Sequence, residues 1–340
     1  MDKFKADRRT LLKGGTIASL AASVGMTDLV PNAFAAQTHA TLHPRAPQGL
    51  DGSGTKLVLL GTGGGPILGQ RRHMTSHLLI SNGATYVVDC GMTVSNRIAQ
   101  ARGDFKSIKG VFITHHHPDH NAEYGPLLLM AWIQGRYGSL ETYGPPPLRQ
   151  ITDDYLKSIK WTTDLWVEDM KVPPFPAINV HEVAVGGPVM SDENVRVTAT
   201  LVQHPPIVPA LGYRFDFQNR SIAFSGDTVM AESVVELARG ADVLVHEAMY
   251  VPALDRMIDV LAGGKAPAQR HATIMDHMLR DHTTAEQAGI VAERAGVKTL
   301  VLSHLTPGAD RPVVPPATWI NEAKKHFSGE VILGDDLMVI

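Results

Sequence analysis

The residues with the clearest capacity for chemistry stand in one stretch, His115 to His120, with the sequence His-His-His-Pro-Asp-His. His115 and His117 are two positions apart, so their side chains share one side of an extended segment. Asp119 and His120 follow at the next bend. Imidazoles and carboxylates are ligands for Zn²⁺ and similar divalent ions. The stretch therefore predicts a metal site, and four potential ligands in one loop favour a site for two ions.

The elements around this stretch are predicted to carry more polar residues to the same place. An apolar run predicts a buried strand over 108–114 that delivers the histidine loop, and a helix over 127–134 follows it. Three more predicted strands end in the same way, at His204, at Gly226-Asp227 and at His304. Because α/β proteins build sites from strand ends on a rigid scaffold, we expect these residues to converge.

The remaining elements predict a layered α/β fold. Hairpins are expected around Asn82-Gly83 and Asn219-Arg220, each flanked by apolar strands. A helix over 284–295 is expected to begin at Thr284, with Glu286 in its first turn. Two β-rich halves with helices between them indicate layers of sheet and helix. Further elements are expected as strands over 56–60, 196–203, 242–246 and 298–303, a helix over 94–102, and one or two strands within 330–340.

The amino-acid composition limits the classes of protein to which this chain can belong. The 340 residues suffice for one or two domains, and 44% hydrophobic with 19% charged residues is ordinary for a globular protein. A net charge of −3 leaves no electrostatic footprint for nucleic acid or an anionic membrane. The single cysteine, Cys90, excludes an internal disulfide and a thiolate-rich zinc site. Any zinc must therefore be held by nitrogen and oxygen ligands.

The N-terminus has the pattern of an export signal. Arg8-Arg9 precedes a weakly apolar run over 14–26, and Ala33-Phe34-Ala35 offers a cleavage site. We expect a twin-arginine signal peptide over 1–35, a linker over 36–55, passage through the twin-arginine machinery and a periplasmic or secreted protein. The apolar run is too short for a stable membrane anchor. A disordered or amphipathic N-terminus is the alternative.

The chain resembles the metallo-β-lactamase fold superfamily, within the branch that contains tRNase Z and arylsulfatase-type enzymes. The resemblance covers roughly residues 56–310, and it implies a four-layer αβ/βα sandwich over 56–340 with inserts near 148–178 and 252–281. Five motifs with matching order and spacing carry it: Leu60-Gly61-Thr62-Gly63-Gly64, Thr114-His115-x-His117-x-Asp119-His120, His204, Ser225-Gly226-Asp227-Thr228 and Ser303-His304. Two further motifs narrow the branch: His246-Glu247-Ala248 and His282-x-Thr284-Ala285-Glu286-Gln287-Ala288.

The resemblance also implies a role for each site residue. Two divalent ions are expected, with Zn²⁺ preferred and Mn²⁺ or Fe as alternatives. The expected metal ligands are His115, His117 and His204 for the first ion, Asp119, His120 and His304 for the second, and Asp227 as the bridge. The catalytic residues implied are Asp119, which orients the nucleophilic water, and a Glu247–His282 pair, which donates a proton to the leaving oxygen. A buried ion pair without a catalytic role is the alternative for Glu247 and His282.

The expected reaction is hydrolysis of small esters, with sulfate esters or phosphodiesters preferred. The export signal, the negative net charge and the lack of an obvious basic arm argue against tRNA, so no nucleic acid is expected as a partner. A β-lactamase or lactonase, and a non-catalytic metal-binding protein, are the alternatives. A homodimer is left open.

Several other residues could shape the pocket. Asp89 is expected to orient a ligand histidine, and His277 is a candidate for the pocket lining, as are His73 and His271. The insert over 148–178, with Trp161 and Trp166, could roof the pocket or equally be an ordinary packed cap or dimer contact. The insert over 252–281 could supply further wall.

Overall fold

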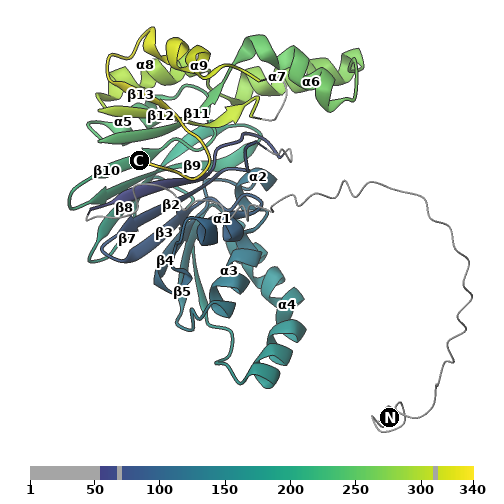
Figure 1. Cartoon of the computed structure of the whole chain (residues 1–340), viewed down its shortest axis with the longest axis vertical. Helices are drawn as coiled ribbons and strands as arrows, with labels where there is room; N and C mark the ends of the chain where they lie inside the picture. Colours follow the sequence, from purple (N-terminus) through teal and green to yellow (C-terminus); the bar gives the residue numbers. More distant parts are fainter. Residues whose placement is uncertain (1–53, 67–70, 309–312) are drawn as a thin grey trace, which may run out of the picture. The chain divides into compact units, whose positions relative to one another are not determined.

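The computed structural model describes residues 54–66, 71–308 and 313–340. The predicted signal peptide and all but the end of the predicted linker lie outside the described residues. Two seven-stranded mixed sheets form the centre of the described part (Figure 1). The first sheet has the order β14-β1-β2-β3-β4-β5-β6, and the second has the order β13-β12-β11-β10-β9-β8-β7.

Each sheet changes from antiparallel to parallel pairing partway across. In the first sheet β14, β1, β2 and β3 pair antiparallel, whereas β3 to β6 pair parallel. Its strands are β1 (Lys56–Gly61), β2 (Ser76–Ser81), β3 (Ala84–Val88), β4 (Ile108–Phe112), β5 (Leu140–Gly144), β6 (Ile178–Glu182) and β14 (Met338–Val339).

The second sheet repeats this arrangement, with β7 to β10 antiparallel and β10 to β13 parallel. Its strands are β7 (Gly187–Ser191), β8 (Val195–His204), β9 (Ile207–Phe217), β10 (Ser221–Phe224), β11 (Val243–Met249), β12 (Thr299–Thr306) and β13 (Glu330–Leu333).

Strand alternation divides the apolar residues among three layers of core. In β1, Leu57 and Leu59 face the layer between the sheets, whereas Val58 and Leu60 face the helices outside the first sheet. In the inter-sheet layer Phe112 of β4 packs edge-on against Phe215 of β9, with ring centroids 5.0 Å apart. Both faces of each sheet are thus covered, as parallel strands require.

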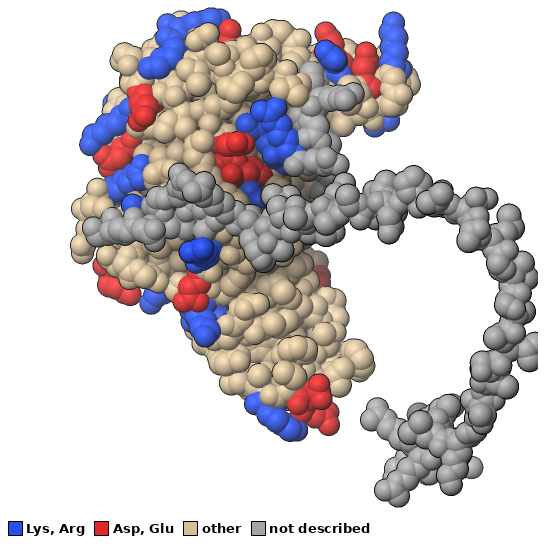
Figure 2. Space-filling model, viewed as in Figure 1, with Lys and Arg blue, Asp and Glu red and all other residues tan. Residues whose placement is uncertain are grey.

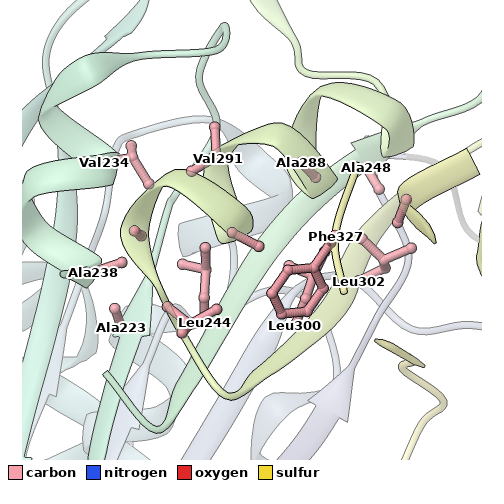
Figure 3. Packing of buried hydrophobic residues seen from close by; sticks show 14 of the residues in the cluster. Ala223, Val234, Ala238, Leu244, Ala248, Ala288, Val291, Leu300, Leu302 and Phe327 are labelled. Carbon is pink, nitrogen blue, oxygen red and sulfur yellow. The ribbon is translucent and has the colours of Figure 1, made fainter. Parts of the chain in front are cut away.

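Helices complete the outer layers. Helices α1 (Val94–Gln100) and α3 (Tyr124–Ile133) bury their apolar faces on the first sheet. Helices α5 (Glu232–Ala238), α8 (Ala285–Ala295) and α9 (Pro316–Lys324) lie on the second, where small residues such as Ala288 and Ala238 allow close packing (Figure 3). The four-layer αβ/βα sandwich is therefore confirmed.

Helix α8 begins as its sequence predicts. Thr284 accepts a hydrogen bond from the backbone N–H of Gln287, and the Gln287 side chain accepts one from the backbone N–H of Thr284. This reciprocal capping box satisfies two backbone donors that a helix start would otherwise leave unpaired. The partner of Thr284 is Gln287 rather than Glu286. The cap also fixes the chain just after His282, at the edge of the candidate site.

Two helical segments project from the sandwich (Figure 1). Helix α4 (Leu148–Met170) contains most of the first insert, and Trp161 on it is 75% exposed. Helices α6 (Leu254–Leu261) and α7 (Ala268–Asp281) form the second insert and pack on each other. The described residues include no helix that is both long and apolar enough to span a bilayer.

Candidate metal centre

The histidine loop follows β4 and is fixed by Asp89 at the end of β3. One carboxylate oxygen of Asp89 accepts hydrogen bonds from the backbone N–H of Thr114, at 2.8 Å, and from its hydroxyl. The other oxygen lies 2.8 Å from Nδ1 of His120. Short helix α2 (Pro118–Asn121) then turns Asp119 and His120 inward, with Pro118 in its first turn. Asp89 therefore orients His120, as the sequence predicts.

The structure brings three histidines and one aspartate together in a first cluster. Nδ1 of His117 lies 3.1 Å from Nε2 of His115 and 3.0 Å from Nε2 of His204. Nε2 of His115 is 3.8 Å from Oδ2 of Asp227, and Nε2 of His204 is 3.9 Å from the same oxygen. These four side chains offer ligand atoms within 4.8 Å of one another, a spacing suited to one metal ion.

A second cluster shares Asp227 with the first. Nε2 of His304 lies 3.1 Å from Oδ2 of Asp119 and 3.1 Å from Oδ2 of Asp227. Nε2 of His120 is 3.3 Å from the same oxygen of Asp227. Asp119, His120, Asp227 and His304 are all buried and form the second group of ligand atoms within 4.8 Å. One carboxylate thus stands between two sets of ligands, which suits a dinuclear metal site.

Hydrogen bonds behind three histidines direct their Nε2 atoms into the centre. Nδ1 of His115 lies 3.1 Å from the hydroxyl of Thr114, and Nδ1 of His120 contacts Asp89. Nδ1 of His204 lies 2.9 Å from the backbone oxygen of Asp281, to which it can donate. Such partners select the ring tautomer and hold its orientation. Sequence reasoning missed Asp281, whose one signal was its position directly before His282.

Glycines let the backbone reach the centre at two points. Gly226 has φ +61°, and a Cβ there would lie 2.5 Å from the backbone oxygen of Leu211. A Cβ on Gly64 would clash with the Thr306 hydroxyl and lie 2.9 Å from Nδ1 of His304. The next residue, Gly65, donates its N–H to Oδ2 of Asp119 at 2.9 Å. The loop that follows β1, residues 62–66, is called the glycine loop, and it therefore lies against the metal centre.

Burial and charge set the protonation of these ligands. Burial lowers the pKa of His204 to about 4, so its imidazole is neutral and its Nε2 lone pair is available. Burial opposes ionisation of Asp119, but the neighbouring His120 and His304 outweigh it and lower the pKa of Asp119 to about 2. Burial likewise opposes ionisation of Asp227, yet the same two histidines hold its pKa well below its usual value. The centre therefore presents ionised carboxylates beside a neutral imidazole.

The donor atoms fit two bound cations. Nε2 of His120 and Oδ1 of Asp227 are buried without a hydrogen-bond partner among the described residues, a costly arrangement unless a ligand satisfies them. Nitrogen and oxygen donors in this number suit Zn²⁺ and related divalent ions. Two such ions, when bound, lower the pKa of a shared water and neutralise charge on the attacked group.

Glu247 and His282 form a pair beside the second cluster. Nδ1 of His282 lies 2.8 Å from Oε2 of Glu247, whose other oxygen accepts a hydrogen bond from the backbone N–H of Thr228 at 2.6 Å. Burial disfavours the charged imidazole of His282, but Glu247 and Asp227 outweigh this and raise its pKa to about 9. Oε2 of Glu247 lies 3.9 Å from Nδ1 of His304, and Nδ1 of His282 lies 4.0 Å from Oδ2 of Asp227.

A cavity of about 340 Å³ opens over the centre, within the usual range for a ligand site. Its floor includes Asp119, Asp227, His282 and His304, and the glycine loop lines one side. Four apolar residues of the second insert form a wall: Met257, Leu261, Ile274 and Met278.

Of the other residues expected near the pocket, some line it and others lie elsewhere. His277 lines the cavity, whereas His73 pairs with Asp336 and His271 pairs with Asp255. Among the described residues that line the cavity, none comes from α4. The first of the two alternatives for the 148–178 insert, a roof over the pocket, is therefore wrong, because this long amphipathic helix extends away from the centre.

Comparisons with known proteins identify the family. Residues 84–305 match the model of the beta-lactamase superfamily domain. Ribonuclease Z from Mycobacterium avium (strain 104) is 32% identical over 288 residues, which cover 83% of this chain and 96% of that protein. Ribonuclease Z from Mycobacterium bovis (strain BCG / Pasteur 1173P2) is 31% identical over 291 residues, again 83% of this chain and 96% of that protein.

Solved structures share the fold. Human tRNase Z, short form, matches with a TM-score of 0.60 and 23% identity, over 84% of this chain and 98% of that chain. The metallo-beta-lactamase fold protein YhfI from Bacillus subtilis gives a TM-score of 0.59 and 21% identity, with the same coverage of 84% and 98%.

These relatives correct two expectations. The prediction that nucleic acid is not a partner is wrong, because the related enzymes are named for ribonuclease activity. The expected small-molecule ester is likewise unsupported. Net charge misled because it averages over the whole surface, whereas a buried metal centre can bind a phosphate without a basic surface. The prediction of a metal-dependent hydrolase of ester bonds is confirmed. The chain belongs to the beta-lactamase superfamily, in the group that includes ribonuclease Z.

Proposed function

We propose that this protein is a metal-dependent phosphodiesterase that cleaves RNA. The observation that carries the proposal is the Asp227 carboxylate, which is shared by two ligand clusters and lies 4.0 Å from Nδ1 of His282 in the Glu247–His282 pair. Relatives at 31–32% identity along nearly their whole length are named ribonuclease Z. The cavity above the centre is large enough to hold one part of a polymeric substrate at a time.

Each residue has a specific role in this proposal. His115, His117 and His204 would hold one ion, Asp119, His120 and His304 the other, and Asp227 both, with Zn²⁺ preferred. The carboxylate of Asp119 orients the attacking water. His282, held by Glu247, delivers a proton to the oxygen that leaves when the phosphorus–oxygen bond breaks, so that the departing strand ends in a hydroxyl.

One face of the protein shows no basic groove, which fits binding through the metal centre. On the face of the described residues seen in Figure 2, blue and red side chains are interspersed and no continuous blue band crosses the surface. Phosphate contacts usually supply much of the affinity for nucleic acid. On this protein we therefore expect the cations to supply a large part of that attraction.

Hydrolysis assays with the zinc-loaded protein test the proposal. We expect turnover of bis(p-nitrophenyl) phosphate and of an RNA stem with a single-stranded 3′ extension, and no turnover of an aryl sulfate or a β-lactam. Asp227→Ala should abolish both activities. Turnover of the sulfate or the β-lactam without cleavage of RNA would contradict the proposal.

We also propose that the protein is exported through the twin-arginine route. The supporting feature is Arg8-Arg9 ahead of a weakly apolar run. Fractionation of cells that express the full chain tests this. The wild-type protein should be found in the periplasm, and a variant with Arg8→Lys and Arg9→Lys should stay in the cytoplasm. Equal distribution of the two proteins would exclude this route.

A further inference from the structure

Helices α6 and α7 pack on each other as a hairpin that projects from the sandwich (Figure 1), and residues of both helices line the cavity over the metal centre. Leu254, Met257 and Ile258 from α6 are buried against Met249 at the end of β11, and Ile274 and Met278 from α7 pack onto the same cluster. The hairpin is therefore anchored to the strand that carries Glu247. Its inner side chains are held in place by packing, so the surface that they present to the cavity is preformed.

The side of the cavity formed by the hairpin is apolar. Met257, Leu261, Ile274 and Met278 line it, and no lysine or arginine lies among the described residues of the cavity lining. The floor carries the ligands and His282. A phosphate is suited to the floor, whereas the wall is suited to a flat, uncharged group. Methionine adapts to such a group, because its thioether is flexible and polarizable and contacts aromatic rings favourably.

His277 marks the border between wall and floor. Its Nδ1 lies 2.6 Å from Oδ2 of Asp281, which fixes the ring. The ring centroid lies 5.7 Å from that of His282 and 6.4 Å from that of His117. The wall thus adjoins His282, which directly follows α7 and is the proposed proton donor. It therefore lies on the side of the centre where the leaving oxygen departs.

We propose that the α6–α7 hairpin binds the unpaired nucleobase of the nucleotide that carries the leaving oxygen. This inference rests on the proposed RNA phosphodiesterase activity and adds the substrate feature that the enzyme selects. The scissile phosphate occupies the floor, and the base of the leaving nucleotide lies against Met257, Met278 and Ile274. A base within a duplex is stacked on both faces and paired along its Watson–Crick edge, so only a single-stranded nucleotide can enter.

Abasic substitution in the RNA substrate tests the proposal. Three versions of the same stem with a 3′ extension are compared: intact, abasic on the leaving side of the scissile bond, and abasic on the other side. The product that ends in a hydroxyl identifies the leaving side. With wild-type protein, the leaving-side abasic substitution should lower kcat/KM by roughly tenfold or more, the scale expected for the lost burial of a group of this size against an apolar wall. The other abasic substitution should have little effect.

Variants of the hairpin complete the experiment. A double variant, Ile274→Ala with Met278→Ala, should lose about the same factor on intact RNA and nothing further on leaving-side abasic RNA. Its unchanged rate on the abasic RNA shows that the centre remains intact. The control is Leu279→Ala, because Leu279 neighbours Met278 on α7 but is 52% exposed and outside the cavity lining. It should behave like the wild type.

The outcomes separate this inference from the activity on which it rests. Equal rates on intact and leaving-side abasic RNA would overturn the base-binding role while RNA cleavage stands. A larger effect on the opposite side would overturn it as well, as would equal losses by the double variant on both substrates. Failure of the wild-type protein to cleave any of the RNAs would overturn the proposed function and the inference together.

Discussion

Asp281 connects the second insert to the metal centre through His204. The backbone oxygen of Asp281 lies 2.9 Å from Nδ1 of His204, and its buried carboxylate is bound by His277 and Arg280. The end of α7 thus orients His204, a candidate ligand at the end of β8, 77 residues earlier in the chain. The geometry of the hairpin and that of the metal site are therefore coupled.

Loss of the Asp281 carboxylate should weaken metal binding. Asp281→Ala leaves the backbone oxygen in place but frees the end of α7, so that His204 is held less firmly. Changes to such outer partners typically cost 10–100-fold in metal affinity or activity, and we expect a zinc dissociation constant raised by about that factor. Competition with a chromophoric chelator measures it. Asp276→Ala is the control, since Asp276 also pairs with Arg280 but has a side chain 70% exposed. Equal affinities for all three proteins would contradict the coupling.

Zinc should stabilise the folded protein through Asp227. The metal-free centre keeps ionised carboxylates and buried atoms without partners, and a ligand that binds only the folded state raises its stability. We expect the Tm of chelator-treated protein to rise by several degrees when zinc is added. Metal analysis should give two ions per chain, and fewer in Asp227→Asn. A Tm that zinc leaves unchanged would argue against a metal centre.

His282 should matter more for a poor leaving group than for a good one. p-Nitrophenolate leaves without a proton, whereas the sugar oxygen of RNA needs one. His282→Ala should therefore lower the rate of RNA cleavage by about 10²–10⁴-fold, the contribution of a positioned acid, and the rate on bis(p-nitrophenyl) phosphate much less. Glu247→Gln should show the same pattern in weaker form. An equal loss of rate on both substrates would indicate damage to the metal site, because His282 lies next to Asp227 and Glu247 lies next to His304.

Much of the candidate site follows from the sequence because its residues stand directly at strand ends. The spacing in the His115–His120 loop and the strand ends at His204 and Asp227 can be read from the local pattern, whereas the assignment of His204 and Asp227 as ligands came from the family resemblance. The features that were not predicted from the sequence depend on contacts between distant segments. Strands β6 and β7 carry mostly exposed or half-exposed residues and have weak apolar patterns. The direction of α4 and the apolar wall of the α6–α7 hairpin are set by packing that no local pattern encodes.

Asp336 is a further residue that sequence reasoning missed, and it ties the C-terminal segment to the loop after β1. Its carboxylate accepts hydrogen bonds from the backbone N–H and hydroxyl of Thr62, 274 positions away, and from the backbone N–H of His73. It also lies 3.4 Å from the guanidinium of Arg97. Nothing in the Asp335-Asp336 dipeptide distinguishes Asp336, whose side chain is 9% exposed, from its more exposed neighbour.

This network should make stability depend on pH. Burial opposes ionisation of Asp336, but its hydrogen bonds with His73 and Thr62 outweigh this and lower its pKa below the usual 3.8. A carboxyl whose pKa is lower in the folded state contributes stability above its unfolded pKa, and that contribution is lost as pH falls through the folded pKa. Asp336→Asn should therefore cost about 2–4 kcal/mol near neutral pH, as expected for breaking a buried charged network.

The pH profile and a neighbouring control make this test specific. Urea unfolding of chelator-treated protein, between pH 7 and pH 3, removes any contribution from metal loss. The difference between wild type and Asp336→Asn should shrink steadily below about pH 4, where this carboxyl gains its proton in the unfolded chain, until pH has fallen through the lower folded pKa. Asp335→Asn should change stability by less than about 1 kcal/mol, because the side chain of Asp335 is 64% exposed and solvent screens its ion pair with Arg72. The buried guanidinium of Arg72 keeps its hydrogen bonds to Thr62 and to the backbone oxygen of Gly334. A difference for Asp336→Asn that persists unchanged at low pH would show that shape, rather than charge, holds this segment against the loop.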